Sequence, residues 1–344
     1  MNAADEAQVL VSVRSLRKHF PIHRGIFRRE VGAIRAVDDL SFDIRRGETL
    51  GLVGESGSGK STTGRVMLAL DKPTGGEVSF GGKDIASLSA GELQRVRQQI
   101  QFIFQDPYAS LNPRMRIGKA VREPLDIHNL GSPRQRDARV SELLEMVGLD
   151  ASYVRRFPHE FSGGQRQRIG IARALATEPS FIVADEPISA LDVSIQAQIV
   201  NLLDDLKDEL GLTYLFIAHD LSMVRHLSDR VAVMYLGRLV ETGSCSDVFQ
   251  SPRHPYTRAL MAAMPVASPA RIGRRITTTL QGEIPNPAEP PAGCHFHTRC
   301  PFATDYCRKE RPLLRSIDGA AADHEVACHH AETIGQAADE ETES

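Results

Sequence analysis

The sequence has no long hydrophobic run, no export signal and no excess of basic residues. No window approaches the roughly 20 apolar residues that a membrane-spanning helix requires. The first ten residues, MNAADEAQVL, contain neither the basic region nor the apolar region of a secretory signal. Lysine and arginine total 41 against 44 aspartate and glutamate residues, so the basic excess typical of nucleic-acid-binding proteins is missing. We therefore expect a cytosolic protein that reaches a membrane only through a partner and binds no nucleic acid.

Cysteine is absent before residue 245, and four of the five cysteines lie between Cys294 and Cys328. A secreted, disulfide-linked protein would distribute its cysteines more evenly and would carry an export signal. The clustering therefore indicates a local site rather than a disulfide framework. Cys245 stands apart, and the sequence assigns it no role.

The pattern of apolar residues predicts an α/β protein. Short apolar runs alternate with longer segments of helical periodicity. The segment Phe181–Ala184 is continuously apolar, as expected of a central parallel strand. Arg230–Val233 and Arg238–Glu241 flank a turn that contains Gly237 and predict a hairpin. The remaining predicted strands are Gln8–Arg14, Ala36–Ile44, Thr49–Val53, Ile100–Gln105 and Tyr214–Ala218.

Changes in composition divide the chain into three parts. Residues 1–260 form the α/β domain, within which the polar stretch 107–160 predicts a helical subdomain. Residues 261–330 form a small cysteine-rich extension that contains a stiff linker, because prolines between Ile284 and Pro291 cannot continue a helix or a central strand. Residues 331–344 form an acidic tail that we expect to be disordered.

The segment GESGSGKS fits the P-loop pattern. It follows the predicted strand Thr49–Val53 and opens a helix near Lys60, which is the context that a P-loop requires. Its glycines allow consecutive backbone N–H groups to surround a phosphate at a helix N-terminus. Lys60 can neutralise the β- and γ-phosphate oxygens, and the Ser61 hydroxyl can bind Mg²⁺. The predicted ATP-binding residues are Gly54, Glu55, Ser56, Gly57, Ser58, Gly59, Lys60, Ser61 and Thr62.

Two acids follow the apolar strand Phe181–Ala184. Asp185 can hold Mg²⁺ through water, and Glu186 can orient and deprotonate the attacking water. Without a P-loop, an acidic strand end would simply mark a surface turn. With one, it predicts the catalytic half of a nucleotide-hydrolysing site.

The segment FSGGQ at Phe161–Gln165 separates this sequence from other P-loop proteins. By itself it is a helix start, in which the serine caps the helix and the glycines permit close backbone approach. Together with Gln105, Ser189–Asp192 and His219, in this order, it resembles the ATP-binding cassette family over residues 8–260. The resemblance implies a P-loop NTPase with a RecA-like core, an antiparallel β subdomain and a helical subdomain.

The resemblance also implies residue roles. Gln105 would sense Mg²⁺ and the γ-phosphate, and His219 would contact the γ-phosphate. The implied catalytic residues are Lys60, Gln105, Glu186 and His219, and the implied magnesium ligands are Ser61, Gln105 and Asp185. A second chain would complete each ATP site through Ser162, Gly163, Gly164, Gln165 and Asp192. Because the chain has one P-loop and one such segment, its active unit would be a dimer.

Members of the family stack an aromatic side chain on adenine near their N-terminus. Phe20 occupies the expected place, with His19 as the alternative. The stretch Pro21–Val31 is an insertion relative to shorter members. Just past Gln105, the segment Asn112–Gly118 is the predicted docking surface for a permease.

Finer motifs resemble the oligopeptide/dipeptide importer group. They are Ala36–Asp39, Gln105–Arg114, Val193–Gln198, His254–Thr257 and the proline linker before Cys294. Thr62–Arg65 resembles the F-type ATPase, which pairs with a D-type ATPase beneath two permeases and a periplasmic or lipid-anchored binding protein. The resemblance implies ATP-driven peptide import at the cytoplasmic face of a bacterial inner membrane. Nickel or glutathione import, and a soluble assembly such as the carbon–phosphorus lyase complex, stay open.

Four thiolates can bind an iron–sulfur cluster or a zinc ion. The gaps between these cysteines are wider than in most zinc knuckles, and members of the importer group with this tail are associated with a [4Fe–4S] cluster. We therefore expect that cluster at Cys294, Cys300, Cys307 and Cys328. Zinc with His295, His297, His324, His329 or His330, and four buried free thiols, are the alternatives.

Overall fold

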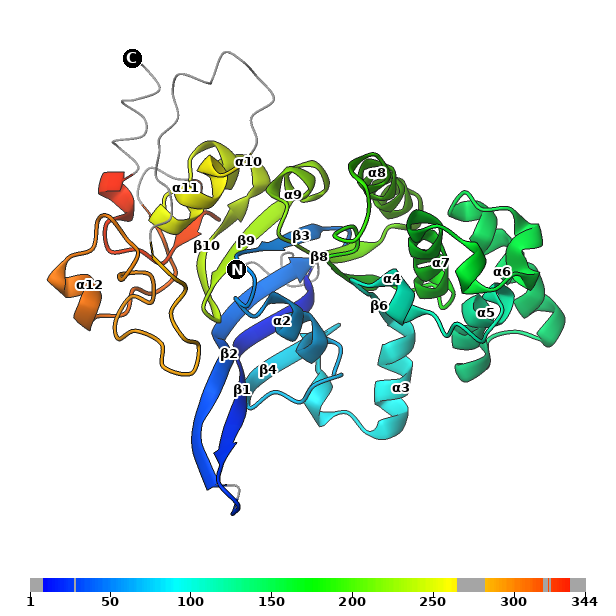
Figure 1. The fold of residues 1–344 in the computed structure, drawn as a ribbon, viewed down its shortest axis with the longest axis horizontal. Coiled ribbons are helices and arrows are strands. Elements are labelled where there is room, and N and C mark those ends of the chain that lie inside the picture. Colours follow the sequence, from blue (N-terminus) through cyan, green and yellow to red (C-terminus); the bar gives the residue numbers. More distant parts are fainter. Residues whose placement is uncertain (1–8, 28, 265–281, 318–320, 322, 335–344) are drawn as a thin grey trace, which may run out of the picture.

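The computed structural model describes residues 9–27, 29–264, 282–317, 321 and 323–334. Two β-sheets account for the strands of these residues, and helices surround the larger sheet (Figure 1). The larger sheet has the strand order β11-β12-β10-β9-β3-β8-β7-β6, and the smaller one has the order β2-β1-β4-β5. Both faces of the larger sheet are buried, so its central strands need apolar residues at every position.

Five parallel strands form the centre of the larger sheet. They are β6 (Ile100–Ile103), β7 (Phe181–Asp185), β8 (Thr213–Ala218), β3 (Thr49–Val53) and β9 (Arg230–Tyr235). Every residue of β3, β7 and β8 is buried. The antiparallel β10 (Arg238–Ser244) follows β9 and completes the hairpin predicted around Gly237. These strands confirm the predicted α/β class.

The smaller sheet is antiparallel and is built on a long hairpin. Its strands are β1 (Val9–Arg24), β2 (Arg29–Arg45), β4 (Gly75–Phe80) and β5 (Lys83–Asp84). The sequence predicted only part of β1 and β2 and neither β4 nor β5. The stretch Pro21–Val31, expected as an insertion, continues the hairpin, whose outer part projects from the body of the molecule (Figure 1).

A group of helices extends from the β6 edge of the larger sheet to one end of the molecule (Figure 1). They are α4 (Pro107–Ser110), α5 (Ile117–Ile127), α6 (Pro133–Met146) and α7 (Gly163–Leu175), and the short 3₁₀ turns η2 (Ala151–Arg155) and η3 (Pro158–Glu160) lie between α6 and α7. Ser132 begins α6 with a capping box, and Pro133 occupies its first position. Helix α7 packs against α5 and α6, so the helical group extends beyond the predicted stretch 107–160.

The remaining helices flank the sheets. They are α2 (Lys60–Met67), η1 (Ile85–Ser87), α3 (Ala90–Gln99), α8 (Val193–Leu210), α9 (Leu221–Leu227), α10 (Cys245–Gln250), α11 (Pro255–Ala262) and α12 (Asp305–Lys309). None of the helices in the described residues is long and apolar enough to span a bilayer. Helix α8 ends at Gly211, whose φ of 64° lies in the left-handed region that glycine adopts without strain.

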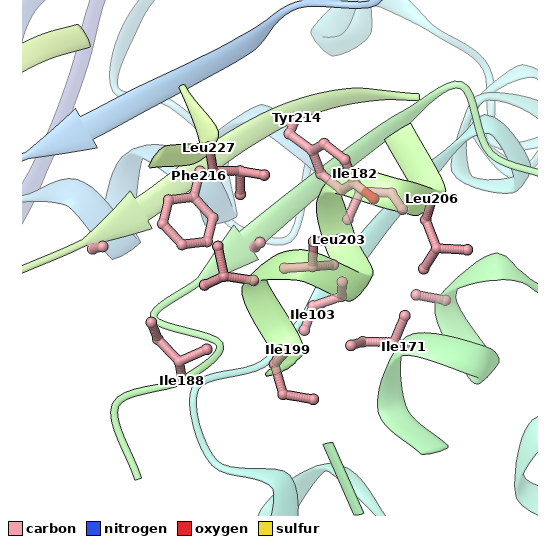
Figure 2. Packing of buried hydrophobic residues seen from close by; sticks show 14 of the residues in the cluster. Ile103, Ile171, Ile182, Ile188, Ile199, Leu203, Leu206, Tyr214, Phe216 and Leu227 are labelled. Carbon is pink, nitrogen blue, oxygen red and sulfur yellow. The ribbon is translucent and has the colours of Figure 1, made fainter. Parts of the chain in front are cut away.

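Side chains from α8 cover one face of the larger sheet. Figure 2 shows Ile199, Leu203 and Leu206 of α8 beside Ile182 of β7 and Phe216 of β8. The three α8 residues recur at helical spacing, so a single face of the helix is buried. Because α8 packs against β7 and β8, it holds in place the strand ends that lead into the polar residues of the site.

The C-terminal residues join the cassette rather than forming a separate module. Strand β12 (Glu325–Val326) pairs with β10, and β11 (Arg315–Ser316) pairs with β12. The Ala327 N–H donates a 2.8 Å hydrogen bond to the Val240 carbonyl. Phe296 is 2% exposed and belongs to the core that includes Tyr235 and Tyr256. The expectation of a separate cysteine-rich module is therefore not supported, because the open edge of β10 and a core aromatic pocket receive this segment.

The acidic tail predicted at residues 331–344 lies largely outside the described residues, which end at 334. Much of the segment between α11 and the proline linker, residues 265–281, also lies outside them. In the described part of the linker, the Pro287 carbonyl accepts a 3.2 Å hydrogen bond from the Arg35 N–H on β2. The linker is thereby fastened to the long hairpin.

Candidate active site

The phosphate loop connects β3 to α2 with three glycines at positive φ, and two of them, Gly54 and Gly59, also lack room for a side chain. Gly54 has a φ of 152°, and a Cβ there would lie 2.2 Å from the Met234 carbonyl oxygen. Gly59 has a φ of 105°, and its Cβ would lie 1.9 Å from the Ala36 carbonyl oxygen. Both backbone neighbours are immovable in comparison with a side-chain tip. The loop therefore requires glycine at these two positions.

Lys60 lies inside the loop and is 4% exposed. Its Nζ donates hydrogen bonds of 2.7 Å to the Gly54 carbonyl and 3.0 Å to the Glu55 carbonyl. Burial lowers the pKa of Lys60, while the nearby carboxylates of Glu186 and Asp185 raise it in opposition. A buried cation with these partners can transfer its hydrogen bonds to phosphate oxygens.

Asp185 ends β7 beside the start of α2. The Ser61 hydroxyl donates a 2.9 Å hydrogen bond to its Oδ1. Burial raises the pKa of Asp185, and the Ser61 hydrogen bond lowers it in opposition. Glu186 adds a second negative charge that raises it further. A hydroxyl and a buried carboxylate in contact, with a second acid nearby, are a donor set that suits Mg²⁺.

Two residues predicted from distant parts of the sequence meet at Glu186. The Gln105 amide donates a 2.9 Å hydrogen bond to Glu186 Oε2, and His219 Nδ1 lies 3.2 Å from the same oxygen. Glu186 has a φ of 45°, in the left-handed region that non-glycine residues adopt only when their surroundings enforce it. This backbone conformation accompanies the turn of the Glu186 side chain toward Gln105 and His219.

A cavity of about 480 Å³ opens over these groups. The predicted residues that line it are Ser56, Gly57, Gly59, Lys60, Ser61, Thr62, Gln105, Glu186 and His219. The sequence did not predict Ile34, Ala36 and Pro287, which also line it. Ile34 and Ala36 belong to β2, where it passes the phosphate loop, and Pro287 belongs to the proline linker. Ala36 belongs to the motif Ala36–Asp39 and Pro287 to the proline linker, but neither pattern predicts a place at the cavity, because the long hairpin and the linker meet only in the folded chain.

The residues predicted for adenine stacking lie beside the cavity and do not line it. Phe20 is 38% exposed and is the cross-strand neighbour of the lining residue Ile34. Lys18 Nζ lies 4.8 Å from the centroid of the Phe20 ring. His19, the alternative, is 3.1 Å from Asp38 Oδ1 through its Nε2. Adenine stacking by Phe20 therefore stays a prediction.

The FSGGQ segment forms the N-terminus of α7. The backbone N–H of Gln165 donates to the Ser162 hydroxyl at 3.3 Å, and the Gln165 side chain accepts from the Ser162 N–H at 3.1 Å. A Cβ on Gly164 would lie 2.5 Å from Ile195 Cγ2, so close packing against α8 requires glycine there. Asp192 stands at the N-terminus of α8 and makes no capping hydrogen bond.

None of the five residues predicted to act from a second chain lines the cavity described above. They are Ser162, Gly163, Gly164, Gln165 and Asp192. Helix α7 lies with α5 and α6, whereas α2 lies nearer the centre of the molecule (Figure 1). Within one chain, the phosphate loop and the FSGGQ segment are therefore separate features.

The four clustered cysteines lie near enough to one another to affect the pKa of Cys328. The pKa of Cys328 is raised to about 12, chiefly by burial, with smaller contributions from Cys294, Cys300 and Cys307. The described residues contain no group of three or more His, Cys, Asp or Glu side chains that could hold a metal ion. The structure thus gives no support to the predicted iron–sulfur cluster or to its zinc alternative.

Most of the histidines considered as zinc ligands have other partners. His324 is buried and lies 2.8 Å from Glu241 Oε1. His297 donates to the Cys294 carbonyl at 2.8 Å, and His329 lies 3.0 Å from the Glu310 carbonyl. Only His330 contacts a clustered thiol among the hydrogen bonds described, at 3.5 Å from Cys307 Sγ.

Two family models match the chain. The "ABC transporter" model matches residues 37–189, and the "Oligopeptide/dipeptide transporter, C-terminal region" model matches residues 240–307. The oligopeptide transport ATP-binding protein AppF of Bacillus subtilis is 53% identical over 330 residues, 96% of this chain and 99% of its own length. The chain belongs to the ABC transporter family. Within it, the C-terminal match places this ABC ATPase in the oligopeptide/dipeptide group.

Solved structures support the same fold for this ABC ATPase. The dimeric, post-hydrolysis structure of the ATP-binding cassette MJ0796 bound to ADP and Pi has a TM-score of 0.61 and 32% identity. It covers 69% of this chain and 99% of MJ0796. CbiO1 of Clostridium perfringens, part of the ABC transporter complex cbiONQ, has a TM-score of 0.61 and 28% identity, covering 70% of this chain and 91% of its own. The cassette fold predicted from the sequence is confirmed.

Proposed function

We propose that this ABC ATPase powers the import of oligopeptides or dipeptides into a bacterial cell. The observation that carries the proposal is the similarity to an oligopeptide transport ATP-binding protein over nearly the whole chain. That similarity includes the C-terminal region, which a generic cassette would not need. The cargo itself contacts other subunits, so no residue of the ATP site selects it.

The chemistry proposed for the site is hydrolysis of the γ-phosphate bond of ATP. Lys60 and the loop N–H groups bind the phosphates, and Glu186 accepts a proton from the attacking water. Gln105 and His219 hold the Glu186 carboxylate in place, as their 2.9 and 3.2 Å contacts with its Oε2 suggest. Mg²⁺, held by Ser61, Asp185 and Gln105, would neutralise charge on the phosphates.

We propose that two cassettes close face to face to complete each ATP site. Support comes from the separation of the FSGGQ segment from the cavity and from the dimeric state of the similar cassette MJ0796. Ser162 and the α7 N-terminus of one chain would then face the γ-phosphate bound by the other, where a helix dipole favours an anion. The partner cassette proposed is the D-type ATPase, which would make the pair a heterodimer.

A second cavity, of about 260 Å³, is the docking place proposed for a permease. It lies between the larger sheet and the helical group, and its lining includes Phe102, Phe104 and Ile127. Phe104 is 43% exposed and Ile127 is 61% exposed, so apolar surface awaits a partner. Because Gln105 follows Phe104 in the chain, movements of Gln105 at the catalytic site would be transmitted to a partner bound at Phe104. No residue of Asn112–Gly118, the docking segment predicted from the sequence, lines this cavity, so that segment stays a separate prediction.

The complete assembly proposed has this ATPase and its partner on the cytoplasmic face of the inner membrane. Two permeases would form the path, and a periplasmic or lipid-anchored binding protein would deliver the peptide. The test is to co-express the chain with the permease and ATPase genes that neighbour it, and to measure peptide uptake into reconstituted vesicles that hold the ATPases and trapped ATP on their inner side and the binding protein outside. Uptake of nickel or glutathione, without peptide, or purification with a soluble enzyme complex, would overturn peptide import.

A [4Fe–4S] cluster at the four cysteines is a second proposal, independent of transport. It is favoured over zinc because a cubane distributes its thiolates over four irons, whereas zinc draws all ligands to about 2.3 Å from one ion. Two of the thiols, Cys307 and Cys328, are buried. Anaerobically purified protein should be brown, absorb near 400 nm and contain iron, and Cys307→Ser should lose both signals. Stoichiometric zinc without iron would contradict the proposal.

A further inference from the structure

An arginine of the C-terminal segment reaches the phosphate loop. Arg299 Nη1 donates a 2.7 Å hydrogen bond to Glu55 Oε2, and its Nη2 donates a 3.0 Å bond to Glu55 Oε1. The two groups are 244 residues apart in the sequence. The Arg299 side chain is only 4% exposed and that of Glu55 is 23% exposed. Such paired, charge-assisted hydrogen bonds fix both the position and the plane of the carboxylate.

The backbone of Glu55 is held from the same direction. Its N–H donates a 2.8 Å hydrogen bond to the hydroxyl of Tyr256 on α11. Tyr256 packs in turn against Tyr235 and Phe296, with ring centroids 4.7 and 5.4 Å away. Tyr256 thus anchors the main chain of Glu55, and Arg299 anchors its side chain.

Glu55 adjoins the group that binds phosphate. Its carbonyl accepts the 3.0 Å hydrogen bond from Lys60 Nζ, and Gly54 before it turns the chain from β3 into the loop. If Glu55 moves, the carbonyl that binds Lys60 moves with it. A loop that is fixed before ligand arrives loses less conformational entropy when it binds.

We propose that Arg299 is a positioning residue for ATP binding, which acts through Glu55 to hold the phosphate loop in its binding conformation. The inference gives the C-terminal segment a task at the ATP site of the same chain, besides any task of its cysteines. Arg299 itself does not line the nucleotide cavity. Its effect therefore falls on ATP affinity, while the chemical step at Glu186 proceeds as before.

Arg299→Lys is the main test, because lysine keeps the buried charge but cannot make the paired hydrogen bonds. We expect its Kd for a fluorescent ATP analogue and its KM for ATP to rise about tenfold, with kcat changed less than twofold. Arg299→Ala should raise Kd at least as much. Adding Arg299→Ala to Glu55→Ala should cause no further rise in Kd, because each change alone removes the same pair of hydrogen bonds.

The matched control is Arg315→Ala, which removes an exposed ion pair with Glu332 inside the C-terminal segment. It should leave the Kd for ATP at the wild-type value. That result would show that a change in the C-terminal segment does not by itself weaken ATP binding. Thermal unfolding of each variant separates positioning from simple stabilisation. A lowered Tm with wild-type Kd and KM in Arg299→Lys would overturn the proposal, as would additive effects of the two changes at Glu55 and Arg299.

Discussion

The Ser61 hydroxyl donates its hydrogen bond to Asp185 across 124 residues of sequence. Ser61 belongs to the first turn of α2, and Asp185 is the last residue of β7. The two meet because β3 and β7 are parallel and flank β8, so the loop after β3 and the acid after β7 emerge at one edge. Ligand sites of open α/β sheets form at this carboxyl edge. The contact thus joins the phosphate-binding and catalytic halves of the site.

Glu186→Gln should retain ATP binding and lose turnover. Glutamine keeps the size of the side chain and can still contact Gln105, but it cannot accept the proton of the attacking water. We expect kcat to fall by about 100-fold or more, with ATP-dependent dimers of this chain and its partner cassette visible by size-exclusion chromatography. Hydrolysis at the wild-type rate would refute the general-base assignment.

Lys60→Ala should abolish measurable ATP binding. The substitution removes the cation that lies among Glu186, Asp185 and Glu55, so the phosphates would meet uncompensated negative charge. Equilibrium binding of a fluorescent ATP analogue measures the loss. Circular dichroism should show an intact fold, because the lysine contacts only carbonyls and a hydroxyl of the loop. Retained binding would remove Lys60 from the site.

Ser162→Arg should separate nucleotide binding from dimer closure. The residue caps α7 and lies outside the cavity, so the chain itself should bind ATP with a Kd close to that of the wild type. A bulky cation at the proposed interface should block closure and lower ATPase activity. Analytical ultracentrifugation of the Glu186→Gln chain with its partner cassette and ATP provides the readout. Dimers of undiminished stability would contradict the role of Ser162 in a shared site.

The buried His254 should make stability fall in mild acid. Burial lowers its pKa to about 4, and Glu241 opposes that shift. Because the unfolded pKa is near 6.5, the unfolded chain binds more protons between pH 6.5 and pH 4, and the free energy of unfolding falls as pH decreases through that window. The contribution lost by pH 5 is about 2 kcal/mol.

His254→Asn tests this pH dependence. Asparagine can replace the Nδ1 acceptor that receives the 3.0 Å hydrogen bond from the Tyr256 N–H, but it does not titrate. Urea unfolding at pH 8 sets the baseline for both proteins, and unfolding at pH 5 measures the change. The variant should lose less stability than the wild type over this interval. An equal loss would show that another group titrates.

The local sequence predicted a feature correctly wherever the residues that define it follow one another along the chain. The β3 strand, the glycines of the loop and the start of α2 near Lys60 follow each other along the chain, so propensity and turn chemistry identify them together. The apolar run of β7 and its terminal acids are equally local. By contrast, β4 and β12 were missed: β4 is partly exposed and lacks an apolar run, and β12 has only two residues, which pair with β10 and β11 in the folded chain.

The sequence by itself determined the class of fold, the phosphate loop and the identity of the catalytic candidates. The tertiary structure alone decided which of them meet, with Gln105 and His219 on one oxygen of Glu186. It also decided that Ile34 and Pro287 line the cavity and that Arg299 holds Glu55. The physical reason is the separation along the chain over which each interaction acts. Periodicity, capping and glycine conformation act between near neighbours, whereas burial and paired hydrogen bonds depend on segments that only the folded sheet and core bring together.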